Sequence, residues 1–297
     1  MSPTCFMATH SPELAAFNAL LDADPRHRHM HLVDMPFRAA STWRDRDCQV
    51  GLWKNESQLL AWAVFQPPWR NLDYAIAPSE RGSALEQEVF AWGKQQMIAY
   101  AKHMGEPLHG AVELFEDTPR AQRTVEHLQA LGFEQLDWSI PRFELDLRCE
   151  FPDYQLPAGF RIRPLNGQQE VQEYVDLVEA VFGPNWMTGE WRRRTIAHPA
   201  YRPEIDLIAA NAQDVPVGFC GCWLWRDIGQ IEPLGVHPEY RGLGLARALE
   251  LAACAALQRQ GARLLYVDHG STNERAIALS LKTGFRQTNN ALRYHIH

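Results

Sequence analysis

The sequence lacks the marks of membrane, zinc-binding and secreted proteins. No run of 18 or more apolar residues occurs in its 297 positions, although a helix needs about 20 to cross a bilayer. The six cysteines include no Cys-x-x-Cys pair, which argues against a zinc knuckle or a redox dithiol. The first residues, Met1-Ser2-Pro3-Thr4, show neither a basic leader nor an apolar core, so no signal peptide is expected. These absences predict a cytoplasmic protein that does not act at a membrane.

A basic surface is also missing. The formal net charge is -7 and the sequence pI is about 5.9, whereas general nucleic-acid binders carry a basic balance or stripe. The densest basic run, Trp191–Arg194, indicates the solvated face of a helix. His27, His29 and His31 alternate as they would on a strand, but no second cluster of ligands accompanies them. We therefore expect no nucleic-acid partner and no metal site.

What the sequence does contain is one order of elements repeated twice. Two short pieces recur at matching places: Pro78–Gly82 with Pro238–Gly242, and Leu131–Gln135 with Thr283–Gln287. A period of about half the chain is far longer than that of a solenoid repeat. It predicts two copies of one domain, 1–150 and 151–297. Prolines interrupt both hydrophobic periodicities at the expected join, Arg148–Pro157.

The second half carries the elements on which a site would depend. They are two strands, each followed by a helix: Gln230–Val236, Leu245–Gln260, Leu264–Asp268 and Asn273–Thr283. Short apolar runs indicate the strands, and a 3.6-residue pattern indicates the helices. Phe133–Leu147 and Phe285–Ile296 are each expected to close their half as a hairpin. Cys220 and Cys222 lie two apart in an apolar run, so we expect them on one strand face as small core residues.

A glycine-rich turn, Arg241–Ala246, joins the first of these strands to its helix. Glycine lets the backbone approach a ligand closely and adopt dihedral angles that other residues avoid. The first amides of a helix have no partner within it, and the helix dipole adds partial positive charge there. The turn therefore predicts a phosphate site. It has neither the Gly-Lys-Ser/Thr ending of a P-loop nor the third glycine of the dinucleotide fingerprint.

The segment Val236–Leu249 resembles the acyl-CoA motif of the GNAT superfamily of N-acetyltransferases. That motif is Arg or Gln, two residues, Gly, one residue, then Gly or Ala, and its fixed positions are filled by Arg241, Gly244 and Ala246. The family's second signature, an Asn-led helix that ends in Gly-Phe, is matched by Asn273, Ala276, Leu279 and Gly284-Phe285. The clear resemblance covers about residues 205–297. It implies an α/β fold of two tandem GNAT-like domains, each a mixed and mostly antiparallel sheet flanked by helices.

In this family acetyl-CoA lies in a V between two parallel strands, here those that end at Val236 and Asp268. The resemblance implies that backbone groups near Leu234 and Val236 pair with the pantetheine arm. An amide near Leu234 would polarise the thioester carbonyl, a contact worth about 3–4 kcal/mol. The further cofactor-binding residues implied are Arg241, Gly242, Leu243, Gly244, Leu245, Ala246, Arg247 and Asn273. An acyl group longer than acetyl stays open, because the sequence does not give the width of the cleft.

The candidate catalytic base is Glu232. The acceptor amine must lose a proton before or during its attack, and a carboxylate on the strand is a usual means. Period-two alternation puts Glu232 on one strand face with Leu234 and Val236. The alternative is a carboxylate at the strand end that forms a salt bridge.

The candidate for the catalytic acid departs from the residue that the family usually has. In many family members a tyrosine four residues before the Gly of Gly-Phe protonates the CoA thiolate, and that position is Ser280 here. A serine hydroxyl is shorter and a poorer acid than a phenol. Ser280, water or Tyr266 therefore stand as alternatives for this step.

The first half departs further from the motif. Arg81–Glu86 has Ala at the Gly position and Glu at the Gly-or-Ala position, where a carboxylate would repel a pyrophosphate. No Asn matches Asn273 in the helix before Gly132. We expect this half to have lost CoA binding and to shape the acceptor site or replace a dimer partner, which predicts a monomer.

The acceptor is the least specified part. The tandem arrangement is similar to that of mycothiol synthase, which acetylates an aminosugar conjugate, but this likeness is one of architecture. Trp186, Trp191 and Tyr201 lie where the family builds its acceptor pocket, although core packing is the simpler reading. The expected partner is a small-molecule amine or a peptide amino group. The alternative function is a CoA-binding sensor or scaffold that kept the fold and lost turnover.

Overall fold

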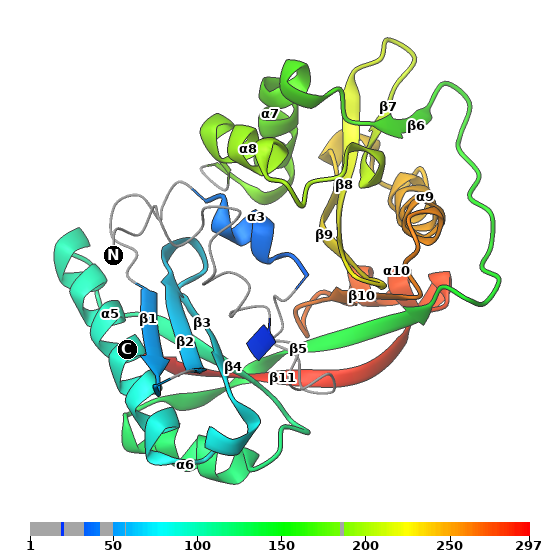
Figure 1. Cartoon of the computed structure of the whole chain (residues 1–297). Helices are drawn as coiled ribbons and strands as arrows, with labels where there is room; N and C mark the ends of the chain where they lie inside the picture. Colours follow the sequence, from blue (N-terminus) through cyan, green and yellow to red (C-terminus); the bar gives the residue numbers. More distant parts are fainter. Residues whose placement is uncertain (1–18, 21–32, 42–49, 57, 185–186) are drawn as a thin grey trace. The chain divides into compact units, whose positions relative to one another are not determined.

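The computed structural model describes residues 19–20, 33–41, 50–56, 58–184 and 187–297. These residues form two compact units. Unit 1 contains the described residues up to 140, apart from 33–41, together with 289–297, and unit 2 contains 33–41 and 141–288. The chain passes from one unit to the other inside two long strands, β5 (Glu134–Asp146) and β11 (Arg286–Ile296) (Figure 1).

Unit 1 has the strand order β1-β2-β3-β4-β11. Its other elements are β1 (Val50–Lys54), β2 (Leu59–Gln66), η1 (Pro67–Trp69), β3 (Asn71–Ile76), η2 (Pro78–Glu80), α5 (Ala84–Met104), β4 (Gly110–Phe115) and α6 (Ala121–Ala130). The pair β3–β4 is parallel, and the other neighbours are antiparallel. α5 begins where the Ser83 side chain accepts a hydrogen bond from the amide of Leu85, and its buried residues Val89, Phe90 and Met97 join the core of the unit.

Unit 2 has the strand order β5-β10-β9-β8-β7-β6. Its strands besides β5 are β6 (Arg161–Pro164), β7 (Asp206–Ala210), β8 (Pro216–Trp225), β9 (Ile228–Val236) and β10 (Leu264–Asp268). Its helices are α3 (Met35–Ala39), η3 (Gly167–Glu170), α7 (Val171–Phe182), α8 (Gly189–Ala197), η4 (Pro203–Ile205), η5 (Pro238–Tyr240), α9 (Leu245–Arg259) and α10 (Glu274–Thr283). The pair β9–β10 is parallel. The strands and helices expected around the glycine turn are confirmed.

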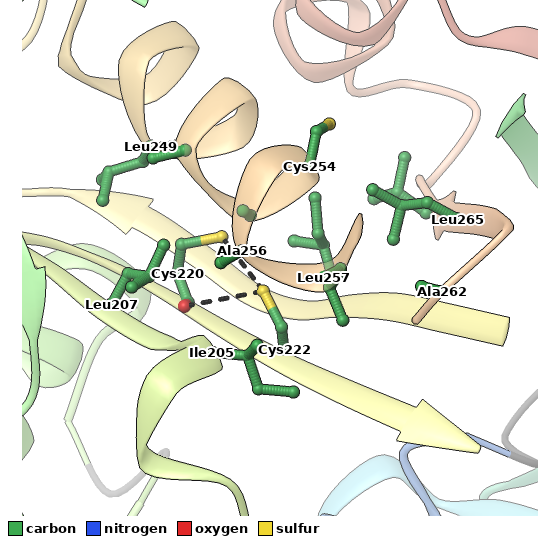
Figure 2. Close-up of a cluster of buried hydrophobic side chains, with 14 of the residues drawn as sticks. Ile205, Leu207, Cys220, Cys222, Leu249, Cys254, Ala256, Leu257, Ala262 and Leu265 are labelled. Atoms are coloured by element: carbon green, nitrogen blue, oxygen red, sulfur yellow. Dashed lines mark hydrogen bonds between the residues drawn. The ribbon is translucent and has the colours of Figure 1, made fainter. Parts of the chain in front are cut away.

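The core of unit 2 lies between α9 and one face of the sheet. Leu249, Ala253 and Leu257 recur every four residues along α9 and are fully buried, as one face of a helix requires. Cys220 and Cys222 point into this core from β8, with their Sγ atoms 3.8 Å apart (Figure 2). The prediction that they are core residues on one strand face is confirmed. On the other side of β8, Figure 1 shows α7 and α8.

The two closing hairpins expected from the sequence are wrong. Residues 134–146 and 286–296 are each one continuous strand, and no residue of either has the positive φ that a tight hairpin turn needs. The end of β5 pairs with β10 through residues 142–146, whereas the end of β11 pairs with β4 through residues 291–296. Each half of the sequence thus completes its last strand in the unit built mainly by the other half. The domain boundary at 150/151 was predicted from the sequence repeat and stays a prediction. The compact units do not test it, because each of them combines segments that are separated in the sequence.

Candidate functional site

Two parallel strands of unit 2 separate and form a V. The register of β9 and β10 runs from Leu264 opposite Ile228 to Tyr266 opposite Gln230. Beyond Gln230, β9 continues to pair with β8 as far as Val236 but no longer pairs with β10. The strands therefore part after Tyr266 and Gln230, which leaves the backbone around Leu234 and Val236 on one arm, as the resemblance implies.

The glycine turn lies at the end of that arm and is open. Gly242 and Gly244 have φ of +82° and +83°, in the left-handed region that glycine adopts readily. A Cβ added at either position would meet no atom within 4 Å. Leu243 between them is 46% exposed, and α9 starts after Gly244 without a side-chain cap. The first amides of α9 therefore face a space that an anion can enter.

Arg241 and Asn273 support the site through local contacts. The Arg241 Nε donates to the carbonyl of Val236 at 3.1 Å, which ties the turn to the end of β9. The Asn273 Oδ1 accepts from the amide of Ala276 at 3.3 Å and caps α10. The structure thus brings Leu234, Val236 and the turn to one end of the V. Their contact with a cofactor stays a prediction.

The matching turn of unit 1 is filled by its own side chain. Glu86, which stands where Ala246 stands in unit 2, is 2% exposed. Its Oε2 accepts from the amide of Gly82 at 3.0 Å and from the Thr124 hydroxyl at 3.0 Å, and His127 Nδ1 lies 3.2 Å away. Burial raises the pKa of Glu86, while these hydrogen bonds lower it. The carboxylate therefore takes the place that a phosphate would need.

Glu232 lies beside a bulge that changes the expected strand face. Cys220 pairs with Leu234 and Cys222 pairs with Ile231, so Gly221 alone opposes both Glu232 and Pro233. Ile231, Leu234 and Val236 all belong to the core on the α9 side. Because the extra residue reverses the alternation, Glu232 does not share a face with Leu234 and Val236.

The surroundings of Glu232 suit a base with access to a ligand. Its side chain is half-buried, and its carbonyl accepts from the indole Nε1 of Trp223 at 3.1 Å. Tyr174 of α7 is fully buried, and its pKa is raised mainly by burial, with Glu232 and Asp206 adding to the rise. Because Ile231, Leu234 and Val236 face α9, the carboxylate lies on the opposite side of the sheet, which α7 covers (Figure 1).

Ser280 and Tyr266 are both turned away from solvent. Ser280 is 0% exposed, so it has no surface to offer a thiolate directly. Its hydroxyl lies between Glu250 of α9 and His269, the residue after β10, at 2.8 Å and 2.9 Å. Tyr266 is buried and donates to the Gln230 Oε1 at 2.9 Å, and burial raises its pKa, which makes it a weaker acid.

The acceptor candidates have mixed positions. Trp186 lies outside the described residues. Trp191 is fully buried and donates from Nε1 to the carbonyl of Phe37 at 2.9 Å. Tyr201 is half-buried and donates to Asp206 Oδ2 at 2.6 Å, while the same carboxylate pairs with Arg192. The core reading of Trp191 is confirmed. The solvated face expected for the basic run is found at Arg193, which is exposed, but is wrong for Arg192, which is buried because it pairs with Asp206.

Two parts of the site have no signal in the local sequence pattern. The first is α3, whose Phe37 stacks on Trp191 with ring centroids 5.0 Å apart and whose neighbour Asp34 donates its amide to Gln230 at 3.0 Å. The second is the buried Glu250 of α9, whose hydrogen-bond partners Ser280 and Thr283 lie on α10. Only the pairing of distant segments gives either residue its place.

Metal and membrane features can be checked over the described part of the chain. There, no group of three or more His, Cys, Asp or Glu side chains is arranged to hold a metal ion. The histidines at 27, 29 and 31 lie outside it. Among the same described residues, no helix has the length and apolar character needed to span a bilayer.

Comparison with known proteins finds a family match within the second half. Residues 171–285 match the model of the Acetyltransferase (GNAT) family. The mycothiol acetyltransferase of Paenarthrobacter aurescens strain TC1 is 35% identical over 150 residues, which are 45% of this chain and 45% of that protein. The mycothiol acetyltransferase of Frankia casuarinae is 29% identical over 249 residues, 76% of this chain and 68% of that protein. The chain spans about half the length of the first of these relatives.

Solved structures agree at the level of the fold. A tandem GNAT protein from the clavulanic acid biosynthesis pathway superposes with a TM-score of 0.66 at 14% identity, over 95% of this chain and 94% of that one. A GCN5-related N-acetyltransferase from Sphaerobacter thermophilus gives a TM-score of 0.65 at 19% identity, over 81% and 78%. The expected α/β architecture with two tandem GNAT-like domains is confirmed.

Proposed function

We propose that the chain moves an acetyl group from acetyl-CoA to an amine. The premise is that residues 171–285 form a domain of the GNAT acetyltransferase family. The observation that carries this proposal is the open glycine turn at the start of α9, beside the V of β9 and β10. Backbone amides there can hold phosphate without any bound metal or basic side chain. Residues 242–247 would hold the pyrophosphate, and the arm around Leu234 and Val236 would hold the pantetheine.

Unit 1 supports the same assignment by contrast. Its turn has the same place in the fold, but Glu86 accepts from the Gly82 amide, which removes a donor and adds negative charge. We therefore propose one acetyl-CoA per chain, bound by unit 2. A tandem chain already carries two GNAT-like units, and we propose that it acts as a monomer.

The acceptor side favours an amine whose proton passes to Glu232. The carboxylate is half-buried on the face that α7 covers, where α3 and α8 also contribute. The acceptor is proposed to be a small-molecule amine or a peptide amino group. Because two relatives are named mycothiol acetyltransferase, aminosugar conjugates come first in an acceptor screen. A cytoplasmic location is proposed as well, since all four cysteines of the described residues are free thiols.

The test introduces the residue of unit 1 into unit 2. Ala246→Glu places a carboxylate at the position of Glu86, and it should abolish acetyl-CoA binding measured by titration calorimetry. Ala246→Gln has nearly the same size without the charge, so it separates charge from bulk. We expect one site per chain in the wild-type protein, a weaker site in Ala246→Gln and none in Ala246→Glu.

Other outcomes would change the proposal in defined ways. Two sites per chain would show that unit 1 still binds the cofactor. No binding by the wild-type protein would refute acyl transfer by this chain. Binding of acetyl-CoA without transfer to any amine would favour the CoA-binding sensor. The burial of Ser280 agrees with that alternative, because the side chain cannot contact the thiolate directly.

A further inference from the structure

A continuous chain of hydrogen bonds joins three residues beside the V. The Ser280 Oγ lies 2.8 Å from Glu250 Oε1 and 2.9 Å from His269 Nε2. The three side chains come from α10, α9 and the segment after β10, so three separate elements meet at one serine. This serine holds the position at which the resembling family carries a tyrosine.

His269 is the end of this chain that can reach a ligand. Glu250 and Ser280 are buried, whereas His269 is half-buried and follows directly on Asp268, the last residue of the β10 arm. Its Nε2 is engaged with Ser280, and no hydrogen bond to its Nδ1 is formed among the described residues. Nδ1 is therefore the ring nitrogen that is open to a further partner.

The geometry around Glu250 is suited to a bound proton. The Thr283 Oγ1 lies 2.5 Å from Glu250 Oε2 and 3.1 Å from the Leu279 carbonyl. One hydroxyl has a single hydrogen, so it can donate to only one of these oxygens. If Thr283 donates to Oε2, the proton of Glu250 lies on Oε1, where it satisfies the contact to a Ser280 hydroxyl that donates to His269 Nε2.

The electrostatic environment agrees with this arrangement. Burial raises the pKa of Glu250, while Thr283, Ser280 and Arg247 lower it, and burial lowers the pKa of His269 to about 4, against a smaller opposing effect of Asp268. The imidazole is thus neutral near pH 7, and the carboxyl retains its proton to higher pH than usual. The other titratable groups that face this cluster are Cys254 on α9 and Cys220 on β8.

We propose that His269 gives the proton to the leaving CoA thiolate and that Glu250 resupplies it through Ser280. The inference rests on the proposed acyl transfer. Ser280 and Glu250 act through His269 and are positioning residues, not contacts of the thiolate. The serine and histidine together would replace the single tyrosine of the resembling family.

The step balances without any added reagent. The amine nitrogen bonds to the acyl carbon and loses a proton to Glu232, and the C–S bond breaks with its electron pair left on sulfur. His269 Nδ1 gives its proton to sulfur, and Nε2 takes one from the Ser280 Oγ, which takes one from the Glu250 carboxyl. The imidazole carries one proton before and after the step. Once the products leave, Nδ1 takes a proton from solvent, Nε2 returns one to Ser280 and Ser280 returns one to Glu250, while Glu232 releases its proton to solvent.

The test measures CoA release by a thiol reagent, with the amine found by screening or with water as the acceptor where no amine reacts. Ser280→Ala and His269→Gln should each lower the rate constant of release about 100-fold without changing the calorimetric Kd for acetyl-CoA. Ser280→Thr retains a hydroxyl and should recover most of the rate. Thr124→Val is the matched control, because it removes a buried hydroxyl bonded to a buried glutamate in unit 1.

The pH profile separates a relay from a merely structural role. In the wild-type protein the rate should fall as pH rises through the raised pKa of Glu250, since the donor form is then lost, and this fall should be missing in Ser280→Ala. Equal rates and profiles in the wild-type protein, Ser280→Ala and His269→Gln would refute the relay while leaving acyl transfer intact. Absence of acetyl-CoA binding or of any release by the wild-type protein would refute acyl transfer itself, and the relay with it.

Discussion

At the scale of the residue, Glu232 shows how one inserted position changes what alternation predicts. Counting by twos along β9 assigns Glu232 to the face of Leu234 and Val236, but the bulge opposite Gly221 reverses the count. A Cβ on Gly221 would come within 3.0 Å of the Glu232 carbonyl, so the glycine permits the bulge. The sequence contains both residues, yet the consequence appears only when the strands are paired.

The role of Glu232 as base gives a prediction at this scale. Glu232→Gln keeps the shape of the side chain and removes its ability to take a proton, so the turnover number for acetyl transfer should fall about 100-fold. The Kd for acetyl-CoA should not change, because the carboxylate lies on the α7 side of the sheet. Steady-state kinetics and calorimetry check both parts, with the exposed Glu204→Gln as control. Unchanged turnover in Glu232→Gln would remove this residue from the mechanism.

At the scale of the element, the sequence predicted the features that depend on local pattern and missed those that depend on long-range pairing. The order strand, glycine turn, helix, strand and Asn-led helix was predictable, because each depends on residues close in sequence. The prediction that β5 and β11 are hairpins was wrong. A hairpin and one continuous strand show the same local alternation, and the partners of these strands lie far along the chain. α3 is the same kind of case, since its contacts to Trp191 and Gln230 span more than a hundred residues.

α3 therefore gives a prediction about stability and about the acceptor. Phe37 is 2% exposed and stacks on Trp191, so Phe37→Ala should lower the free energy of unfolding by about 3–5 kcal/mol. Phe182→Ala removes the same side chain from a site that is 43% exposed, and its effect in the same denaturant titration should be much smaller. KM for the acceptor should rise in Phe37→Ala more than the Kd for acetyl-CoA does. Equal losses in the two variants would show that α3 is not an integral part of unit 2.

At the scale of the whole molecule, the sequence repeat and the compact units divide the chain differently. A fragment of residues 151–297 contains both acyl-CoA motifs but lacks the end of β5. It would leave β10 with an unpaired edge and would remove Arg142, whose guanidinium donates to both carboxylate oxygens of Asp268 at 2.8 Å and 2.7 Å. We expect this fragment to aggregate or to melt without cooperativity, as measured by size-exclusion chromatography and circular dichroism. A fragment of residues 134–297 restores β5 and should behave better, whereas a cooperative 151–297 monomer that binds acetyl-CoA would contradict the assignment of β5 to this unit.

The carboxylate of Glu86 has a consequence for a chain built from two related units. Its hydrogen bonds to Gly82 and Thr124 tie the start of α5 to α6, so the side chain that fills the turn also links two helices of unit 1. Replacing it by the small residue that unit 2 carries would empty the turn and remove both bonds together. Room for a ligand and the internal packing of unit 1 are therefore opposed demands on one position.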